Sequence, residues 1–147
     1  MKEFLFLVLF IFLNPLFSFG YVNLDKINSI DLDTNECINK TYKENGNIKK
    51  CATIGIKKYD LEIKKTLVKA KTNLEINQYN QLLKTQKSWE KYIQDFDKLY
   101  DEFYKKNCSK DFSDFCSENA KYQLHKKHVI ELSNFFDDIK VIDKNTK

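Results

Sequence analysis

The spacing of apolar residues along this chain predicts helices. Between residues 48 and 71, apolar positions recur three and four residues apart, which places them on one face of a helix. These positions are Ile56, Tyr59, Ile63, Leu67 and Ala70. No segment alternates apolar and polar residues over a convincing strand length, so the pattern predicts an all-α fold.

A second, longer seam follows the first. Its mean spacing near 3.5 residues is typical of a helix packed along its whole length. The seam positions are Tyr79, Leu82, Gln86, Trp89, Ile93, Phe96, Tyr100 and Phe103. Thr72 and Glu75 have the spacing of a capping box, so we expect this helix to begin at Asn73 and run to Lys106, about 50 Å at 1.5 Å per residue. A rod of that length requires partner helices beside it.

Two further helices complete a bundle of about four, with the Trp89 helix as its long central member. A short one is capped by Asp33 or Thr34 and stops near Gly46. The last begins at Asp111 or Ser113 and runs to about Ile139. Its expected buried face comprises Phe115, Leu124, Val129, Leu132, Phe135 and Phe136. We therefore divide the chain into residues 1–20, a flexible N-terminal arm at 21–34, a helical domain at 35–140 and a polar tail at 141–147.

The first twenty residues have the layout of a cleaved signal peptide. Lys2 precedes an apolar run from Phe4 to Leu13, and small residues at Ser18 and Gly20 fit a peptidase site. The alternative, an uncleaved anchor, needs about 20 apolar residues, and the unbroken run is half that. We expect cleavage after Gly20, no stable membrane anchor afterwards, and a periplasmic or secreted product.

Composition narrows the range of partners. The net charge is +4, and all 25 basic residues are lysine, so the chain has no guanidinium groups for bidentate phosphate recognition. Lysines and acids also alternate along the helices, as on an ordinary solvated face. Nucleic acid is therefore not an expected partner, and nothing in the chain calls for a cofactor.

The four cysteines predict disulfide bonds. An even number of cysteines behind a signal peptide is typical of bridges in an exported domain. Zinc is the alternative, but the pairs lack the close spacing of a zinc knuckle. Of three possible connectivities we favour the one in which each bonded pair flanks a turn between consecutive helices. These bridges are Cys37–Cys51 and Cys108–Cys116.

The order of these features resembles a known family. The first cysteine pair precedes Tyr59-Asp60, and a Gln-x-x-Trp-x-x-Tyr segment follows on the long helix, before the second pair. Over about residues 35–136 this is similar to the lysozyme-inhibitor LprI N-terminal domain family. The residues that match its motif are Asp60, Gln86, Trp89 and Tyr92. The chain departs from the family at Asp97, where the family has a cysteine, and at Lys126 or Lys127, where it has an arginine. The resemblance implies a periplasmic helical protein and, in some members, inhibition of lysozyme.

Other polar residues have simpler interpretations. His125 and His128, three apart on the last helix, could share a metal ion, but without further ligands we expect a solvated or half-buried pair and no metal. Gln86 either contacts a partner or is a buried amide bonded to backbone or to Tyr92, and we favour the buried amide. Trp89 is expected in the core. No catalytic constellation is recognisable, so an enzyme is not expected.

The leading functional hypothesis is a binding protein that occludes a lysozyme-type muramidase. A net charge of +4 opposes steering toward a cationic lysozyme unless acids gather locally. The candidate partner-binding acids are Asp111, Asp114 and Glu118, with Asp137 and Asp138 as possible additions. The alternative is a helical module for cell-envelope assembly or toxin immunity.

Overall fold

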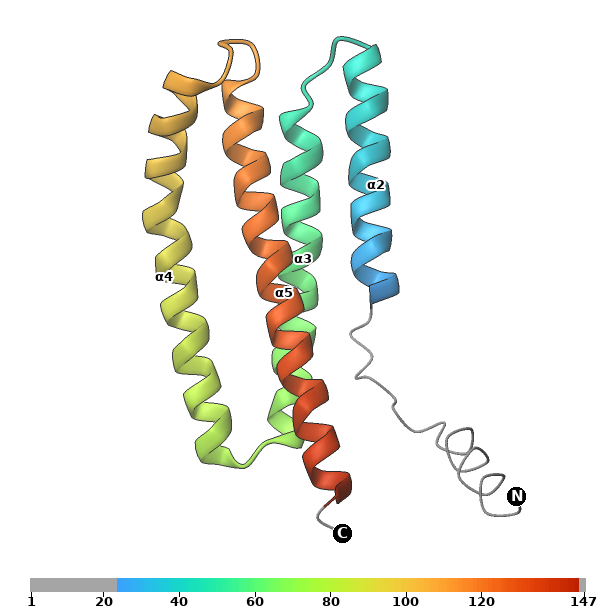
Figure 1. The fold of residues 1–147 in the computed structure, drawn as a ribbon, viewed down its shortest axis with the longest axis vertical. Helices are drawn as coiled ribbons and strands as arrows, with labels where there is room; N and C mark the ends of the chain where they lie inside the picture. Colours follow the sequence, from blue (N-terminus) through green and yellow to red (C-terminus); the bar gives the residue numbers. More distant parts are fainter. Residues whose placement is uncertain (1–23, 146–147) are drawn as a thin grey trace, which may run out of the picture.

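The computed structural model describes residues 24–145, and the side chains of residues 25–136. This part of the chain forms four helices and no strand: α2 (Leu24–Lys43), α3 (Lys49–Asn73), α4 (Ile76–Asn107) and α5 (Ser113–Asn145). Successive helices run in opposite directions (Figure 1). The predicted all-α, disulfide-stapled fold is confirmed. The predicted signal peptide lies outside the described residues.

The centre of the bundle is the pair α3 and α5. These two helices make the most extensive contact, while α4 packs chiefly on α5 and α2 chiefly on α3. Figure 1 shows α2 and α4 on opposite sides of this pair. The helix that carries Trp89 is long, as predicted, but it lies at one side of the bundle, and α5 is the partner along its length.

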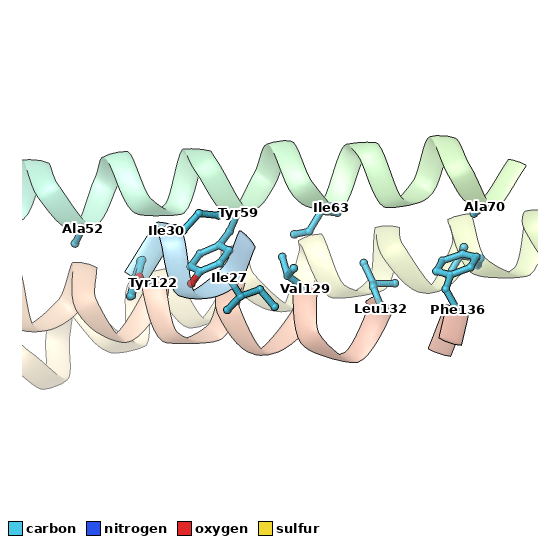
Figure 2. Packing of buried hydrophobic residues seen from close by; sticks show 11 residues of the cluster. Ile27, Ile30, Ala52, Tyr59, Ile63, Ala70, Tyr122, Val129, Leu132 and Phe136 are labelled. Atoms are coloured by element: carbon cyan, nitrogen blue, oxygen red, sulfur yellow. The ribbon is translucent and has the colours of Figure 1, made fainter. Parts of the chain in front are cut away.

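The core is a row of side chains between α3 and α5. Tyr59 and Ile63 of α3 face Val129 and Leu132 of α5 (Figure 2). Gly55 allows the helices to approach closely at one end of this row. A Cβ at position 55 would lie 2.4 Å from a ring carbon of Tyr122, closer than packed atoms tolerate.

Helix α2 begins well before its predicted start. The expected flexible arm at 21–34 is wrong for residues 24–34, which are helical. Ile27 and Ile30 are buried in the core, and the hydroxyl of Thr34 is also buried and donates to the Ile30 carbonyl. Three buried positions at helical spacing were hidden in a polar segment, and packing on α3 stabilises a helix there.

Two other boundaries also differ from the predictions. The capping box is formed by Glu75 and Gln78, not by Thr72 and Glu75, so α4 begins at Ile76. Thr72 instead belongs to α3, and its hydroxyl donates to the Lys69 carbonyl. Helix α5 continues to Asn145, which makes the expected polar tail at 141–147 helical over residues 141–145. No glycine or proline stands in that segment to end the helix.

Both disulfide bonds join the predicted partners. Cys37 is bonded to Cys51, and Cys108 to Cys116. The first ties α2 to α3, and the second ties the end of α4 to α5. The α2–α3 and α4–α5 connections lie at the same end of the bundle (Figure 1), so both bridges fasten that end. Neither bridge reaches the opposite end, which carries the α3–α4 connection.

Candidate functional site

A buried to half-buried group of polar and aromatic side chains joins α3, α4 and α5. We call it the Trp–His cluster: Asp60, Gln86, Trp89, His125 and His128. Trp89 stacks on the His128 ring with centroids 4.0 Å apart and planes 7° apart. Its other contact is edge-on with the His125 ring, at 5.1 Å and 81°. The indole is therefore held between two imidazoles of α5, in geometries that aromatic pairs favour.

Hydrogen bonds fix the orientation of each polar member of the cluster. His125 donates its Nδ1–H to Asp60 Oδ1 of α3 at 2.8 Å. Gln86 donates its Nε2–H to the Glu90 carboxylate at 3.2 Å, which leaves Gln86 Oε1 as an acceptor. His128 Nε2 lies 2.8 Å from that oxygen, so Nε2 carries the proton and the His128 ring is the Nε2–H tautomer.

Burial keeps His128 neutral. Only 6% of this residue is exposed, and loss of solvation, followed by the nearby His125, lowers the pKa of His128 from 6.5 to about 4. Within residues 24–145, no group of three or more His, Cys, Asp or Glu side chains is arranged to hold a metal ion. The cluster is thus built to hold three helices in register through directional bonds.

The structure brings together three of the four family-motif residues. Asp60, Gln86 and Trp89 belong to the Trp–His cluster, whereas Tyr92 does not. Tyr92 is 43% exposed and packs on Phe96 at 4.4 Å between ring centroids. Gln86 is a buried amide, as predicted, but its partners are His128 and Glu90 in place of backbone or Tyr92.

The prediction for the two histidines is wrong. Both are buried, where a solvated or half-buried pair is expected from the sequence. A spacing of three residues puts both rings on one stripe of α5, and Trp89 covers that stripe from the neighbouring helix. Sequence reasoning has no way to place the indole of α4 against these two positions of α5.

Two of the candidate partner-binding acids share one hollow, and Glu118 does not line it. Asp111 and Asp114 line a hollow of about 420 Å³ at the end of the bundle that carries the disulfide bonds. Asp114 Oδ2 lies 4.0 Å from Lys49 Nζ. Glu118 is separate, because it accepts a hydrogen bond from the Thr53 hydroxyl at 2.6 Å. Asp137 lies about 35 Å along α5 from Asp114 at 1.5 Å per residue, and neither its side chain nor that of Asp138 is described.

A second, half-buried polar group is centred on Asp31 of α2, and no pattern in the sequence predicts it. Tyr59, Tyr122 and Lys126 all donate hydrogen bonds to its carboxylate. Burial opposes the charge, but bonds from Lys126 and the two tyrosines outweigh it and hold the pKa of Asp31 below its usual value. Lys126 therefore ties α5 to α2.

The surface of α4 carries an uninterrupted row of aromatic rings. Neighbouring rings contact one another with centroids 4.4 to 6.1 Å apart. We call this row the aromatic ridge: Tyr92, Phe96, Tyr100, Phe103 and Tyr104. The seam prediction placed most of these residues in the core, yet Phe103 is 51% exposed, because α5 covers only one side of α4 at this level.

A hollow of about 380 Å³ adjoins the ridge. Tyr100 and Tyr104 of α4 form one wall, and residues of α5, among them Leu124 and Lys127, form the other. No residue of α2 or α3 lines it, so this hollow opens on a part of the α4–α5 pair that the other described helices leave uncovered.

Comparison with known proteins adds no assignment. No protein-family model, no curated protein and no solved structure matches this chain, so the resemblance drawn from the cysteines and the tryptophan segment stays a prediction. Among residues 24–145, no helix is both long and apolar enough to cross a membrane.

Proposed function

We propose that this chain is an exported, non-catalytic binding protein that holds a protein partner against the aromatic ridge of α4 and the adjoining hollow. The observation that carries the proposal is the exposure of that ridge, since Tyr92 and Phe103 stay 43% and 51% accessible. Phe96, Tyr100 and Tyr104 are partly buried between or beside these two, and such a contiguous, partly exposed aromatic patch is typical of a surface that another molecule covers. Two disulfide bonds are compatible with export.

The composition of this surface supports a protein partner. Charged residues make up 31% of the chain, yet Lys127 is the only described charged residue that lines the hollow beside the ridge. Aromatic enrichment combined with depletion of charge is the compositional signature of an interface core. Tyrosines also supply a polar hydroxyl to a partner, which makes them frequent anchors at interfaces.

A lysozyme-type muramidase is the first partner to test, on the strength of the resemblance through Gln86, Trp89 and the flanking cysteines. Occlusion of the glycosidase cleft would need no chemistry from this chain. The test is a turbidity assay of cell-wall lysis with several lysozymes at about 20 and 150 mM salt. Two net-positive partners repel at long range, so inhibition should strengthen at the higher salt, where the Debye length falls to about 8 Å.

The distribution of charge favours the second candidate, a helical module for envelope assembly or toxin immunity. Of the acids that would steer a cationic lysozyme, Asp114 lies beside Lys49 and Glu118 is bonded to Thr53, so each already has a partner within the molecule. Nothing in the ridge itself selects a cationic partner. If no lysozyme is inhibited at micromolar excess, the inhibitor proposal is abandoned and the assembly proposal replaces it.

A further inference from the structure

A second hollow lies between α4 and α5, nearer the end without disulfide bonds. Its volume is about 650 Å³, within the range of roughly 300–1,000 Å³ that small-molecule sites occupy. Leu82, Leu132 and Phe135 supply apolar walls, and Phe135 is 45% exposed. Amide side chains at Asn77, Gln78 and Gln81 stand around it. It shares no lining residue with the hollow beside the aromatic ridge, so a ligand bound here would be independent of the proposed protein partner.

One buried polar atom of a residue that lines this hollow has no hydrogen-bond donor among the side chains of residues 25–136. Glu90 fixes the Gln86 amide, and Gln86 in turn fixes the proton of His128 on Nε2. The second ring nitrogen, Nδ1, is therefore a bare lone pair on a residue that is 6% exposed. His128 is one of the residues lining the hollow. A buried acceptor without a donor is unfavourable, and a ligand with a donor would remove that cost.

The polar neighbour of this nitrogen is also an acceptor. Glu131 Oε2 lies 3.9 Å from His128 Nδ1, too far for a hydrogen bond, and an ionised carboxylate has no proton to donate. Glu131 is the only charged residue among those that line the hollow. Two acceptors, one of them negative, thus face each other at the edge of an apolar space.

We propose that this hollow binds a small primary amine carried on an apolar chain. An ammonium group has three donors and a positive charge, so it can bond to His128 Nδ1 and Glu131 together. The apolar chain would lie against Leu82, Leu132 and Phe135. An alcohol has one donor and no charge, and a carboxylate has no donor and is repelled by Glu131, so both are poorer ligands of this site.

Three probes of equal chain length test the proposal: hexylammonium, hexanol and hexanoate. Each is titrated into the exported, oxidised protein while the ring nitrogens of both histidines are followed by ¹⁵N NMR. We expect hexylammonium to shift the His128 Nδ1 resonance saturably and to bind at least tenfold more tightly than the other two. Equal affinity for all three probes, or a shift confined to His125, overturns the proposal.

Two charge-removing variants separate this site from general attraction to a negative surface. Glu131→Gln should weaken hexylammonium binding about tenfold and leave hexanol binding unchanged. Glu102→Gln removes an exposed carboxylate of α4 that does not line the hollow, and it should leave both affinities unchanged. Equal losses in the two variants contradict the proposal. Both changes lie on exposed positions, so the fold is expected to survive them.

Discussion

At the scale of single residues, this fold depends on a few polar side chains placed inside it. His128 illustrates the point, because its neutral ring is bonded to Gln86, stacked on Trp89 and close to both His125 and Glu131. Such a buried group stabilises the fold only in one protonation state. Steric fit is equally specific at Gly55, where the neighbouring side chains leave no room for a Cβ.

Stability should fall as His128 is forced to accept a proton. Its folded-state pKa of about 4 lies below the ordinary value of 6.5, so the unfolded chain takes up a proton first as the pH falls. The part of the free energy of unfolding that neutral His128 contributes is fully present above pH 6.5 and is lost between pH 6.5 and 4. The loss between pH 6.5 and 5 is about 2 kcal/mol. Urea unfolding of wild type and His128→Gln across this range measures it. Identical pH slopes in the two proteins would contradict the assignment.

Gly55→Ala tests the close approach of α3 and α5. In an open helix this change would stabilise the protein by roughly 1 kcal/mol. Here the added Cβ would lie 2.4 Å from Tyr122 and 2.8 Å from the Thr34 hydroxyl, and overpacking of this kind costs about 1–3 kcal/mol. We therefore expect net destabilisation in thermal and urea unfolding. A gain in stability would show that the Tyr122 and Thr34 side chains move away from position 55 at little cost.

At the scale of helices, α4 is held to α5 by the contacts of Trp89 and Gln86, by the hydrogen bond from Ser117 to Asp101 and by the disulfide at its end. The α4 seam predicted the inward positions of its first half correctly, since Leu82 and Gln86 are buried. The same seam failed at its last position, since Phe103 is exposed, whereas Phe96 and Tyr100 are partly buried. Periodicity identifies which residues share a face, but it does not reveal how far a neighbouring helix covers that face.

Trp89→Ala should therefore destabilise the domain by about 3–5 kcal/mol, because it empties the space between the two histidine rings. Tyr92→Ala is the matched control on the same helix, one turn away and partly exposed, and it should cost less than about 1 kcal/mol. Equal melting temperatures for wild type and Trp89→Ala would show that the indole does not contribute to core packing.

At the scale of the whole molecule, sequence reasoning recovered the fold class, the helix order and both disulfide partners. It could do so because apolar spacing and cysteine pairs are local signals. The predictions from sequence were wrong or missing where helices that are far apart in the sequence contact one another. The start of α2 depends on Asp31 bonding Tyr59, Tyr122 and Lys126, and the Trp–His cluster depends on α4 lying beside α5. Neither arrangement has a signature in one segment of the chain.

The paired cysteines make a direct prediction for the purified protein. Protein from an oxidising compartment should show no reactive thiol after denaturation, because both pairs are bonded. Each bridge closes a short loop and should contribute about 2–3 kcal/mol if it acts by restricting the unfolded chain. A thiol reagent added to denatured protein gives the count. Two or more reactive groups per chain would contradict the two-bridge structure.

Capture of a partner by matched variants tests the proposed protein-binding surface on the aromatic ridge. Wild type, Tyr92→Ala/Phe103→Ala and Leu61→Ala/Val68→Ala are immobilised and exposed to the same periplasmic extract. The last variant removes exposed apolar residues of α3 and controls for nonspecific adhesion. We predict one partner that wild type and the α3 variant retain equally and that the ridge variant loses at least tenfold. Equal retention of the partner by all three proteins, or loss of the partner by the α3 variant alone, would contradict a binding surface on the ridge.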